Sequence, residues 1–235
     1  MTIDQTYAGI IQECLDGERV RTRNAECFRT TCVKREFTST PLVSVRRTAW
    51  RNCLREWEWF MSGSEDINDL HPDVRSWWEP WGEKDDSWHT NRVRNNYSKQ
   101  FRQFAGNEDY NVTNCDQIEY LLDGIKNHPH SRRNVITTWN TAEMVLPRTQ
   151  ITTCHGTVIQ CFVDLQKRLH LATWQRSVDV LCGLPHNFFQ YWAFLLWLAY
   201  RTGRMPWKLT WIGGDVHVYA EHEEMARRIV EQVRG

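Results

Sequence analysis

Side chains able to do chemistry are concentrated between residues 154 and 187. Cys154 offers a thiol that, as its thiolate, could attack an electron-poor carbon. Arg176 offers a guanidinium for an anion, Asp179 a carboxylate, and Asn187 an amide that both donates and accepts hydrogen bonds. Together these groups could activate a pyrimidine ring.

The Cys154–His155 pair is by itself weak evidence for a nucleophile, because the imidazole of an adjacent residue usually points elsewhere. A cysteine taken alone is more often a small buried apolar residue. A thiolate needs positive potential to form at neutral pH, and Arg132, Arg133 and Arg176 could supply it. These arginines favour a nucleophile at position 154.

Two arginine motifs stand next to predicted strands. Arg132 and Arg133 come just before one strand, and Arg176-Ser177 ends another. Paired guanidinium groups suit a phosphate dianion, since several N–H donors can meet its oxygens in a fixed geometry. Surface arginines would explain either motif separately.

Three further polar residues suit a nucleoside. The Asn187 amide could meet the N3–H and O4 edge of uracil, whereas an aspartate there would suit cytosine. The alternative is an asparagine that only caps a helix start. His217 and Tyr219, two positions apart, point to the same side of an extended segment.

The elements that must position these groups are both helices and strands. Apolar spacing predicts a first helix that carries Ile10, Ile11 and Leu15 after a polar start and is closed by Gly17. Further helices are predicted near 41–61, 114–126, 185–203 and 221–233, with Asn114 and Gln117 as a capping box. Strands are predicted at 25–38, 133–139, 157–164, 169–175 and 209–212, and loops with short helices at 64–110. No linker or repeat divides the chain. We therefore expect one α/β (α+β) domain over residues 1–235.

Composition excludes several classes of protein. Lys plus Arg equals Asp plus Glu at 29 each, so no excess positive charge favours nucleic acid as a partner. The N-terminus lacks a signal-peptide pattern, and the apolar run 188–200 is too short to cross a bilayer, so a cytoplasmic location and no membrane contact are expected. The eight cysteines show no zinc-finger spacing, and no metal is expected.

The segment 174–179, Gly183-Leu184-Pro185-His186-Asn187 and the segment 214–219 together resemble the thymidylate synthase and pyrimidine hydroxymethylase family. Ordered matches extend over nearly the whole chain, including 55–60, 77–81 and 96–102. The resemblance implies a thymidylate-synthase-like single domain with a mixed sheet packed by helices, one sheet face forming a homodimer interface. It also implies a pyrimidine deoxynucleotide monophosphate and a folate as substrates.

The resemblance assigns roles residue by residue. The catalytic set is Cys154, Glu56, Tyr97, Asn187 and Asp179. The substrate-binding set is Arg21, Arg132, Arg133, Gln175, Arg176, Ser177, Asn187, His217 and Tyr219, with Arg132 and Arg133 reaching across the dimer interface. The folate-binding set is Trp78, Trp81, Asp179, Gly183 and His186.

The implied reaction begins when the Cys154 thiolate adds to C6 of deoxyuridylate and makes C5 nucleophilic. Methylenetetrahydrofolate then supplies the carbon, and Glu56 and Tyr97 assist loss of the C5 proton. Hydride transfer from the folate would give thymidylate. Addition of water would instead give 5-hydroxymethyl-deoxyuridylate.

Departures from the synthase pattern favour the hydroxymethylated product. The chain ends at Gly235, soon after Tyr219, so the usual C-terminal segment that closes over folate is expected to be missing. Four residues around the pocket also differ from the pattern: His186, Trp174, Ser98 and Ala49. We therefore expect a deoxyuridylate hydroxymethylase of bacteriophage type. A thymidylate synthase and an inactive nucleotide- or RNA-binding homologue are the alternatives.

Overall fold

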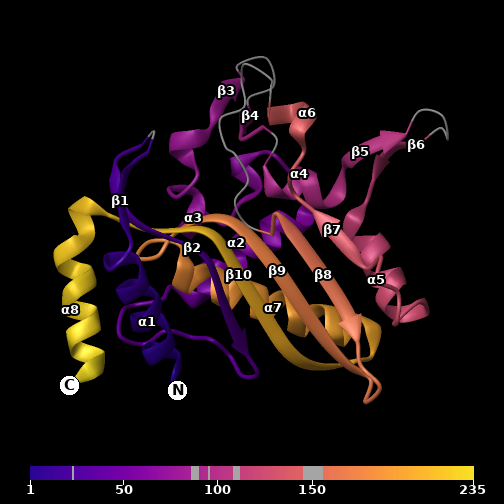
Figure 1. Cartoon of the computed structure of the whole chain (residues 1–235). Coiled ribbons are helices and arrows are strands. Elements are labelled where there is room, and N and C mark those ends of the chain that lie inside the picture. Colours follow the sequence, from indigo (N-terminus) through magenta and orange to yellow (C-terminus); the bar gives the residue numbers. More distant parts are fainter. Residues whose placement is uncertain (23, 86–89, 95, 108–111, 145–155) are drawn as a thin grey trace.

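A six-stranded mixed sheet forms the centre of the computed structural model, which describes residues 1–22, 24–85, 90–94, 96–107, 112–144 and 156–235 (Figure 1). The strand order is β1-β2-β10-β9-β8-β7. The strands are β1 Glu18–Arg21, β2 Glu26–Phe37, β7 Val135–Thr137, β8 Val158–Val163, β9 Arg168–Asp179 and β10 Met205–Tyr219. Only β9 and β10 pair in parallel within this sheet. This confirms the expected mixed sheet.

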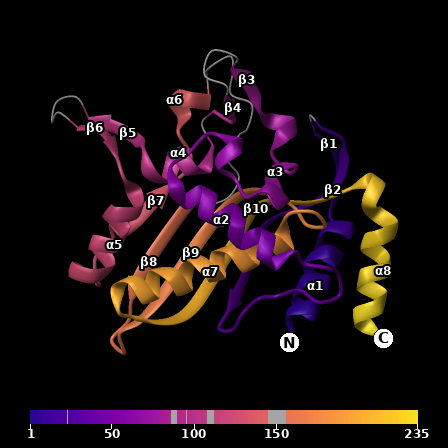
Figure 2. The ribbon, with the colours of Figure 1, turned by 180° about the vertical axis from the view of Figure 1, so that it is seen from behind.

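Helices cover one face of the sheet. Figure 2 shows α7 (Leu184–Thr202) and α2 (Trp50–Ser62) in front of the strands. Helix α1 (Ile3–Leu15) lies beside β2 and packs against α8 (Glu223–Arg234). In Figure 1, seen from the other side, no helix of the described residues covers the strands.

The open face carries apolar side chains. Residues of β8 and β9 alternate between the core and this face, which leaves Val158, Phe162 and Trp174 exposed on it. The Phe162 ring stacks on His170 at 4.4 Å between centroids. The face therefore offers apolar contacts to a further layer.

The predicted helices are present, with two corrected starts. Helix α2 begins at Trp50 rather than near residue 41, because backbone N–H groups of Ser44 and Val45 are bound by the Asp4 carboxylate. It ends as predicted at Gly63, whose φ of 86° suits glycine. Helix α5 (Gln117–Asn127) is capped by Asp116, which accepts from Ile118 N and Glu119 N, and not by Asn114.

Short elements occupy the region predicted as loops with short helices. Its helical pieces are η1 Ile67–Asp69, α3 Pro72–Arg75, η2 Glu79–Trp81 and α4 Tyr97–Arg102. Two small hairpins were not predicted: β3 Glu83–Asp85 with β4 Thr90–Arg92, and β5 Phe104–Asn107 with β6 Val112–Cys115. Two further short pieces are α6 Thr141–Met144 and η4 Ala220–His222.

The parallel pair β9/β10 is longer than predicted at both strands. Their carboxyl ends carry Gln175, Arg176 and Asp215, polar residues that hide the strand pattern. The register shifts once, between Pro206 and Lys208, so Trp207 has no partner on β9. Beyond this bulge the pairing continues to His217 opposite Asp179. Both strands consequently end at the same edge of the sheet.

Aromatic residues pack helices α2, α4 and α7 against one another. Trp57 contacts Phe60, Phe101, Tyr191 and Phe194, with ring centroids 5.2 to 6.4 Å apart. Among the described helices, none is long and apolar enough to span a membrane.

Candidate active site

The site residues predicted from the sequence gather where β9 and β10 end and α7 begins. Gln175, Arg176 and Asp179 come from β9, and His217 comes from β10. Asn187 lies in the first turn of α7. Ligand sites commonly lie at the carboxyl ends of parallel strands, because the polar loops and helix starts meet there.

A directed chain of hydrogen bonds holds the Asn187 amide. Trp211 Nε1 donates to Gln175 Oε1 at 2.8 Å, and Gln175 Nε2 donates to Asn187 Oδ1 at 2.7 Å. All three residues are buried. An indole N–H can only donate, so it fixes the orientation of both amides. Asn187 is therefore more than a cap of α7.

The His217 ring is held by a carboxylate. Nδ1 of His217 donates to Asp215 Oδ1 at 2.8 Å, which leaves Nε2 as the ring nitrogen available to a ligand. The hydrogen bond from His217 holds the pKa of Asp215 below its ordinary value, and the charges of Arg29 and Arg176 add to this. The Tyr219 ring lies 5.0 Å from that of His217, as expected from their spacing, and its hydroxyl accepts from Asn24 Nδ2 at 3.3 Å.

Glu56 is buried in an aromatic setting. Trp78 Nε1 donates to its Oε1 at 2.6 Å, and Gln190 Nε2 donates to its Oε2 at 2.7 Å. Burial raises the pKa of Glu56, and the two donors oppose this shift. The Tyr97 ring packs at 6.1 Å and nearly perpendicular to the Trp78 ring. The structure thus places Glu56, Tyr97 and Trp78 in one cluster.

The predicted phosphate arginines do not all come together. The Arg176 guanidinium lies 5.3 Å from the centre of the Trp139 ring, and Ser177 pairs with Asp215 across the two strands. The Arg21 side chain is largely exposed at the end of β1 and lies 3.9 Å from Glu26. These residues sit at the same end of the sheet as His217.

Arg132 and Arg133 lie elsewhere in the sheet. They precede β7, where Val135 pairs with Gln160 and Gln160 in turn pairs with Ala172. If this antiparallel register is continued by two residues, Arg133 lies level with Phe162 and His170. His170 is six residues from Arg176 on β9, which corresponds to about 20 Å along the strand. Both arginines are exposed. Within one chain they do not reach the site.

The predicted folate residues fall into two environments. Trp78 is buried against Trp59 and Phe60, whereas Trp81 is 46% exposed. Asp179 Oδ1 accepts from the backbone N–H groups of Leu181 and Cys182, which shapes the turn before α7. A Cβ at Gly183 would stand 3.4 Å from Asn187 Oδ1, so glycine keeps space beside the amide.

His186 occupies a pocket wall shared with the start of α2. Its Nδ1 donates to Cys182 O at 3.1 Å, and its Nε2 accepts from Ala49 N at 3.4 Å. Burial lowers the pKa of His186, and the charge of Arg46 lowers it further, so the ring is neutral near pH 7. The Trp77 ring lies 5.7 Å away.

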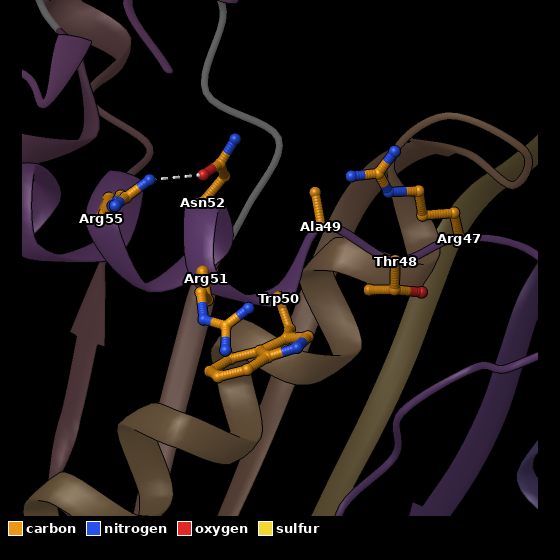
Figure 3. Close-up of a pocket in the computed structure, with 7 residues that line it drawn as sticks. All are labelled: Arg47, Thr48, Ala49, Trp50, Arg51, Asn52 and Arg55. Carbon is orange, nitrogen blue, oxygen red and sulfur yellow. Dashed lines mark hydrogen bonds between the residues drawn. The ribbon is translucent and has the colours of Figure 1, made fainter. Parts of the chain in front are cut away.

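A cationic pocket of about 240 Å³ lies next to this wall. Its lining residues are Arg47, Thr48, Ala49, Trp50, Arg51, Asn52 and Arg55 (Figure 3). Arg55 is bonded to Asn52 at 3.0 Å and paired with Asp73, and Arg51 lies over the Trp50 ring. The pocket suits an anionic group.

The predicted nucleophile Cys154 and its neighbour His155 lie outside the described residues. The described chain resumes at Gly156, whose N–H donates to the Tyr191 hydroxyl at 2.7 Å. Of the other departures from the synthase pattern, Ser98 is buried with its hydroxyl donating to Trp59 O, and Trp174 is exposed on the open sheet face. Neither lines the Asn187 site by these contacts.

Three supporting residues were missed by sequence reasoning. Asp215 orients His217, Trp211 orients Gln175, and Gln190 donates to Glu56. A signal existed for Gln190, because an amide within the apolar stretch of α7 requires a buried partner. The partner itself, on α2, could not be read from the sequence.

Comparison with known proteins agrees with this arrangement. The family model described as Thymidylate synthase matches residues 5–234. The chain belongs to the thymidylate synthase family. This family comprises folate-dependent enzymes that transfer a one-carbon group to C5 of a pyrimidine nucleotide, with methylenetetrahydrofolate as co-substrate.

Relatives include proteins of bacteriophages. The chain is 36% identical to the probable thymidylate synthase of Escherichia phage T5, a match that covers 83% of this chain and 68% of that protein. It is 33% identical to the thymidylate synthase of Enterobacteria phage T4, over 82% of this chain and 66% of that protein. It is 32% identical to the thymidylate synthase of Cereibacter sphaeroides, over 80% of this chain and 68% of that protein. The chain thus spans about two thirds of their lengths.

Proposed function

We propose that the protein is a deoxyuridylate hydroxymethylase, which converts dUMP, methylenetetrahydrofolate and water to 5-hydroxymethyl-dUMP and tetrahydrofolate. The observation that carries the substrate assignment is the directed chain from Trp211 through Gln175 to Asn187. The choice of product is supported by His186.

The fixed Asn187 amide favours uracil over cytosine. Its Oδ1 can accept the N3–H of uracil while its Nδ2 donates to O4. Cytosine offers an acceptor at N3 and a donor at N4, which would require the amide to turn over. That turn would set Asn187 Nδ2 against Gln175 Nε2, two donors facing one another, and Gln175 cannot turn without losing Trp211.

The remaining nucleotide contacts follow from the same edge of the sheet. Nε2 of His217 and the Tyr219 hydroxyl are assigned to a ribose hydroxyl, which is supported by Asp215 occupying the other ring nitrogen. Arg176, Ser177 and Arg21 bind the phosphate. The charge of Arg176 also favours the thiolate of Cys154, which adds to C6 of the ring and makes C5 nucleophilic.

Glu56 and Tyr97 handle protons in this proposal. A buried carboxyl with a raised pKa can hold or release a proton closer to neutral pH than an exposed one. Its two donors come from Trp78 and Gln190, so its position is fixed. Tyr97, packed against Trp78, is assigned to the proton leaving C5.

The residues present fit a folate. Asp179 and Gly183 offer a carboxylate and open space beside Asn187, and Trp77 and Trp81 offer exposed aromatic surface for a flat ring. The arginine pocket around Arg47 and Arg51 suits the carboxylates of the glutamate moiety. When bound, the folate supplies the carbon that joins C5.

His186 supports hydration of that carbon. It is a neutral imidazole next to Asn187, and its 3.4 Å contact with Ala49 N is at the long limit of a hydrogen bond. Nε2 can exchange this weak partner for water. An apolar residue at this position would instead help to exclude water from the site.

A product assay tests the function. The pure protein is incubated with dUMP and methylenetetrahydrofolate, and the nucleotide products are resolved by mass. We expect 5-hydroxymethyl-dUMP with no rise in dihydrofolate absorbance. Cys154→Ser should abolish turnover while nucleotide binding remains, whereas Cys32→Ser, at an exposed cysteine of β2, should leave turnover unchanged.

Thymidylate synthesis is the second candidate, favoured by the names of the relatives in phages T5 and T4. Thymidylate formed together with dihydrofolate would establish it in place of hydroxymethylation. No product of either kind from the unmodified protein would favour a binding module.

A homodimer completes the proposed site. The open sheet face carries Val158, Phe162 and Trp174, and a second copy packed there would cover them. Arg132 and Arg133 are too far from Arg176 within one chain but would reach the phosphate of the second copy. Sedimentation of the pure protein at twice the monomer mass is the expected result, and a charged substitution, Phe162→Glu, should shift it to the monomer.

A further inference from the structure

A second cluster of reactive side chains lies beside the start of α7. We propose that Asp179, Cys182 and His222 bind a divalent transition-metal ion, with Zn²⁺ the best match. Each residue offers one ligand atom, and these three atoms lie within 4.8 Å of one another. The set contains one sulfur, one nitrogen and one oxygen; zinc accepts all three donor types, and three protein ligands leave a fourth position open.

The fold brings the three residues together from separate elements. Asp179 ends β9, Cys182 follows in the turn before α7, and His222 ends η4, directly after β10. Because β9 and β10 are parallel and Asp179 pairs with His217, the segments that follow both strands meet at one edge. Spacing along the sequence therefore did not predict the cluster.

The distances require only a small adjustment. A tetrahedral zinc ion with bonds of about 2.0 to 2.3 Å holds its ligand atoms about 3.3 to 3.8 Å apart. Cys182 is exposed and in a turn, so its thiol can move toward the other two groups. An ion can enter from the side of the exposed Cys182.

The carboxylate is already oriented. Asp179 Oδ1 accepts from Leu181 N and Cys182 N, at 2.9 and 3.1 Å. This fixes the carboxylate. The Cys182 thiol also hydrogen-bonds to the Asp179 side chain, a contact that a shared ion would replace. Hydrogen bonds of this kind, behind a ligand, position it and increase metal affinity.

His222 supplies an independent observation. Its Nδ1 is buried and has no hydrogen-bond partner among the described residues. Buried polar atoms without a partner are uncommon, and an ion is one of the groups that satisfies them. His222 has no role in the reaction proposed above.

Charged groups near the cluster both favour and oppose the binding of a cation. The carboxylates of Asp179 and Glu221 act on Cys182 and favour a cation, whereas Arg46 opposes it. On binding, the Cys182 S–H bond breaks, a sulfur–metal bond forms, and the proton passes to solvent. Arg46→Gln should therefore strengthen metal binding.

Metal binding would affect folate, a consequence that rests on the function proposed above. Asp179 is assigned to the folate, and its second oxygen cannot serve an ion and the folate together. Occupancy of the metal site should therefore compete with methylenetetrahydrofolate and leave dUMP binding unchanged.

Cobalt(II) is a suitable probe because its absorption reports on ligands. We propose to titrate chelator-treated Cys154→Ser protein, without nucleotide or folate, so that the nucleophile does not contribute. The expected result is one bound ion with thiolate-to-cobalt charge transfer and the strong visible bands of a tetrahedral site, lost when Zn²⁺ is added. This readout is independent of any enzymatic activity.

Variants identify the ligands. Adding Cys182→Ser should abolish the charge-transfer band, and Asp179→Asn or His222→Gln should weaken binding at least about tenfold, the lower limit seen even for outer-shell partners. Cys32→Ser, at another exposed cysteine, is the matched control and should change nothing. An unchanged cobalt spectrum in Cys182→Ser would overturn the site. In the unmodified protein, bound metal should raise the KM for methylenetetrahydrofolate. An unchanged KM would overturn the competition with folate but not the metal site itself.

Discussion

Gln175 and Asn187 share a buried hydrogen bond of 2.7 Å whose direction is set by Trp211, which can only donate. The amide proposed to recognise the base is thus oriented from the core of the protein. Selectivity for uracil should depend on a residue that does not contact it.

Trp211→Phe tests this dependence. The change frees Gln175 to turn over, so Asn187 can present either edge, and the preference for dUMP over dCMP should fall by about tenfold, equivalent to roughly 1.4 kcal/mol. Calorimetric dissociation constants for both nucleotides measure it. Trp207→Phe, at a partly exposed position of the same strand, is the control. An unchanged ratio in Trp211→Phe would contradict the orienting role.

Glu56→Gln should reveal a pH-dependent stability. Burial raises the pKa of Glu56 in the folded state above its ordinary 4.5. The stabilisation by the bound proton is therefore complete below about pH 4.5 and is lost as the pH rises through the folded-state pKa. The free energy of unfolding of the wild type relative to Glu56→Gln should fall over that range.

Urea denaturation at a series of pH values measures this difference. The glutamine also faces two donors, Trp78 and Gln190, which adds a destabilisation that does not vary with pH. Glu58→Gln, at an exposed position of the same helix, should show no such trend. A constant difference across the range would contradict the raised pKa.

Arg176→Gln should weaken binding of dUMP but not of deoxyuridine. A hydrogen bond to a charged group contributes about 1.5–3 kcal/mol, so the dissociation constant for dUMP should rise by about 10- to 100-fold. Arg228→Gln, on the exposed side of α8, serves as control. Equal losses for nucleotide and nucleoside would indicate that Arg176 acts on something other than the phosphate.

Two inactive variants should restore activity when combined. If Arg133 serves the site of the second copy, a dimer of one Cys154→Ser chain and one Arg133→Gln chain contains one intact site. Co-expression should give about one quarter of the wild-type sites when chains pair at random. Turnover no greater than the sum of the separate variants would place Arg133 outside the neighbouring site.

Periodicity predicted the helices well because their faces differ in polarity. Helix α7 has a strongly apolar sequence between Pro185 and Gly203, and it lies where expected. The strands β9 and β10 were predicted only in part, since their final residues are polar and serve the site. The alternation of apolar and polar residues therefore fails to predict a strand where its residues make contacts other than core packing.

Contacts between distant segments lay beyond the sequence pattern. Glu56 and Gln190 are far apart in the chain yet share a hydrogen bond of 2.7 Å, and Asp179 approaches His222 only because two parallel strands end together. The motifs that resemble those of a known family predicted Asn187 and His217 as site residues. Their supports, Trp211 and Asp215, emerged only from the three-dimensional arrangement.

The unpaired Trp207 in β10 has a consequence for the whole strand. It is the single residue by which β10 exceeds its neighbour before Lys208, and side chains of a strand alternate from one side to the other. Deleting this one tryptophan would remove the bulge and leave the pairing from Lys208 onward unchanged, whereas deleting one residue after Lys208 would shift the frame of everything beyond it. Only that second deletion would exchange His217 and Tyr219 with their neighbours Val216 and Val218 and leave valine side chains facing the pocket.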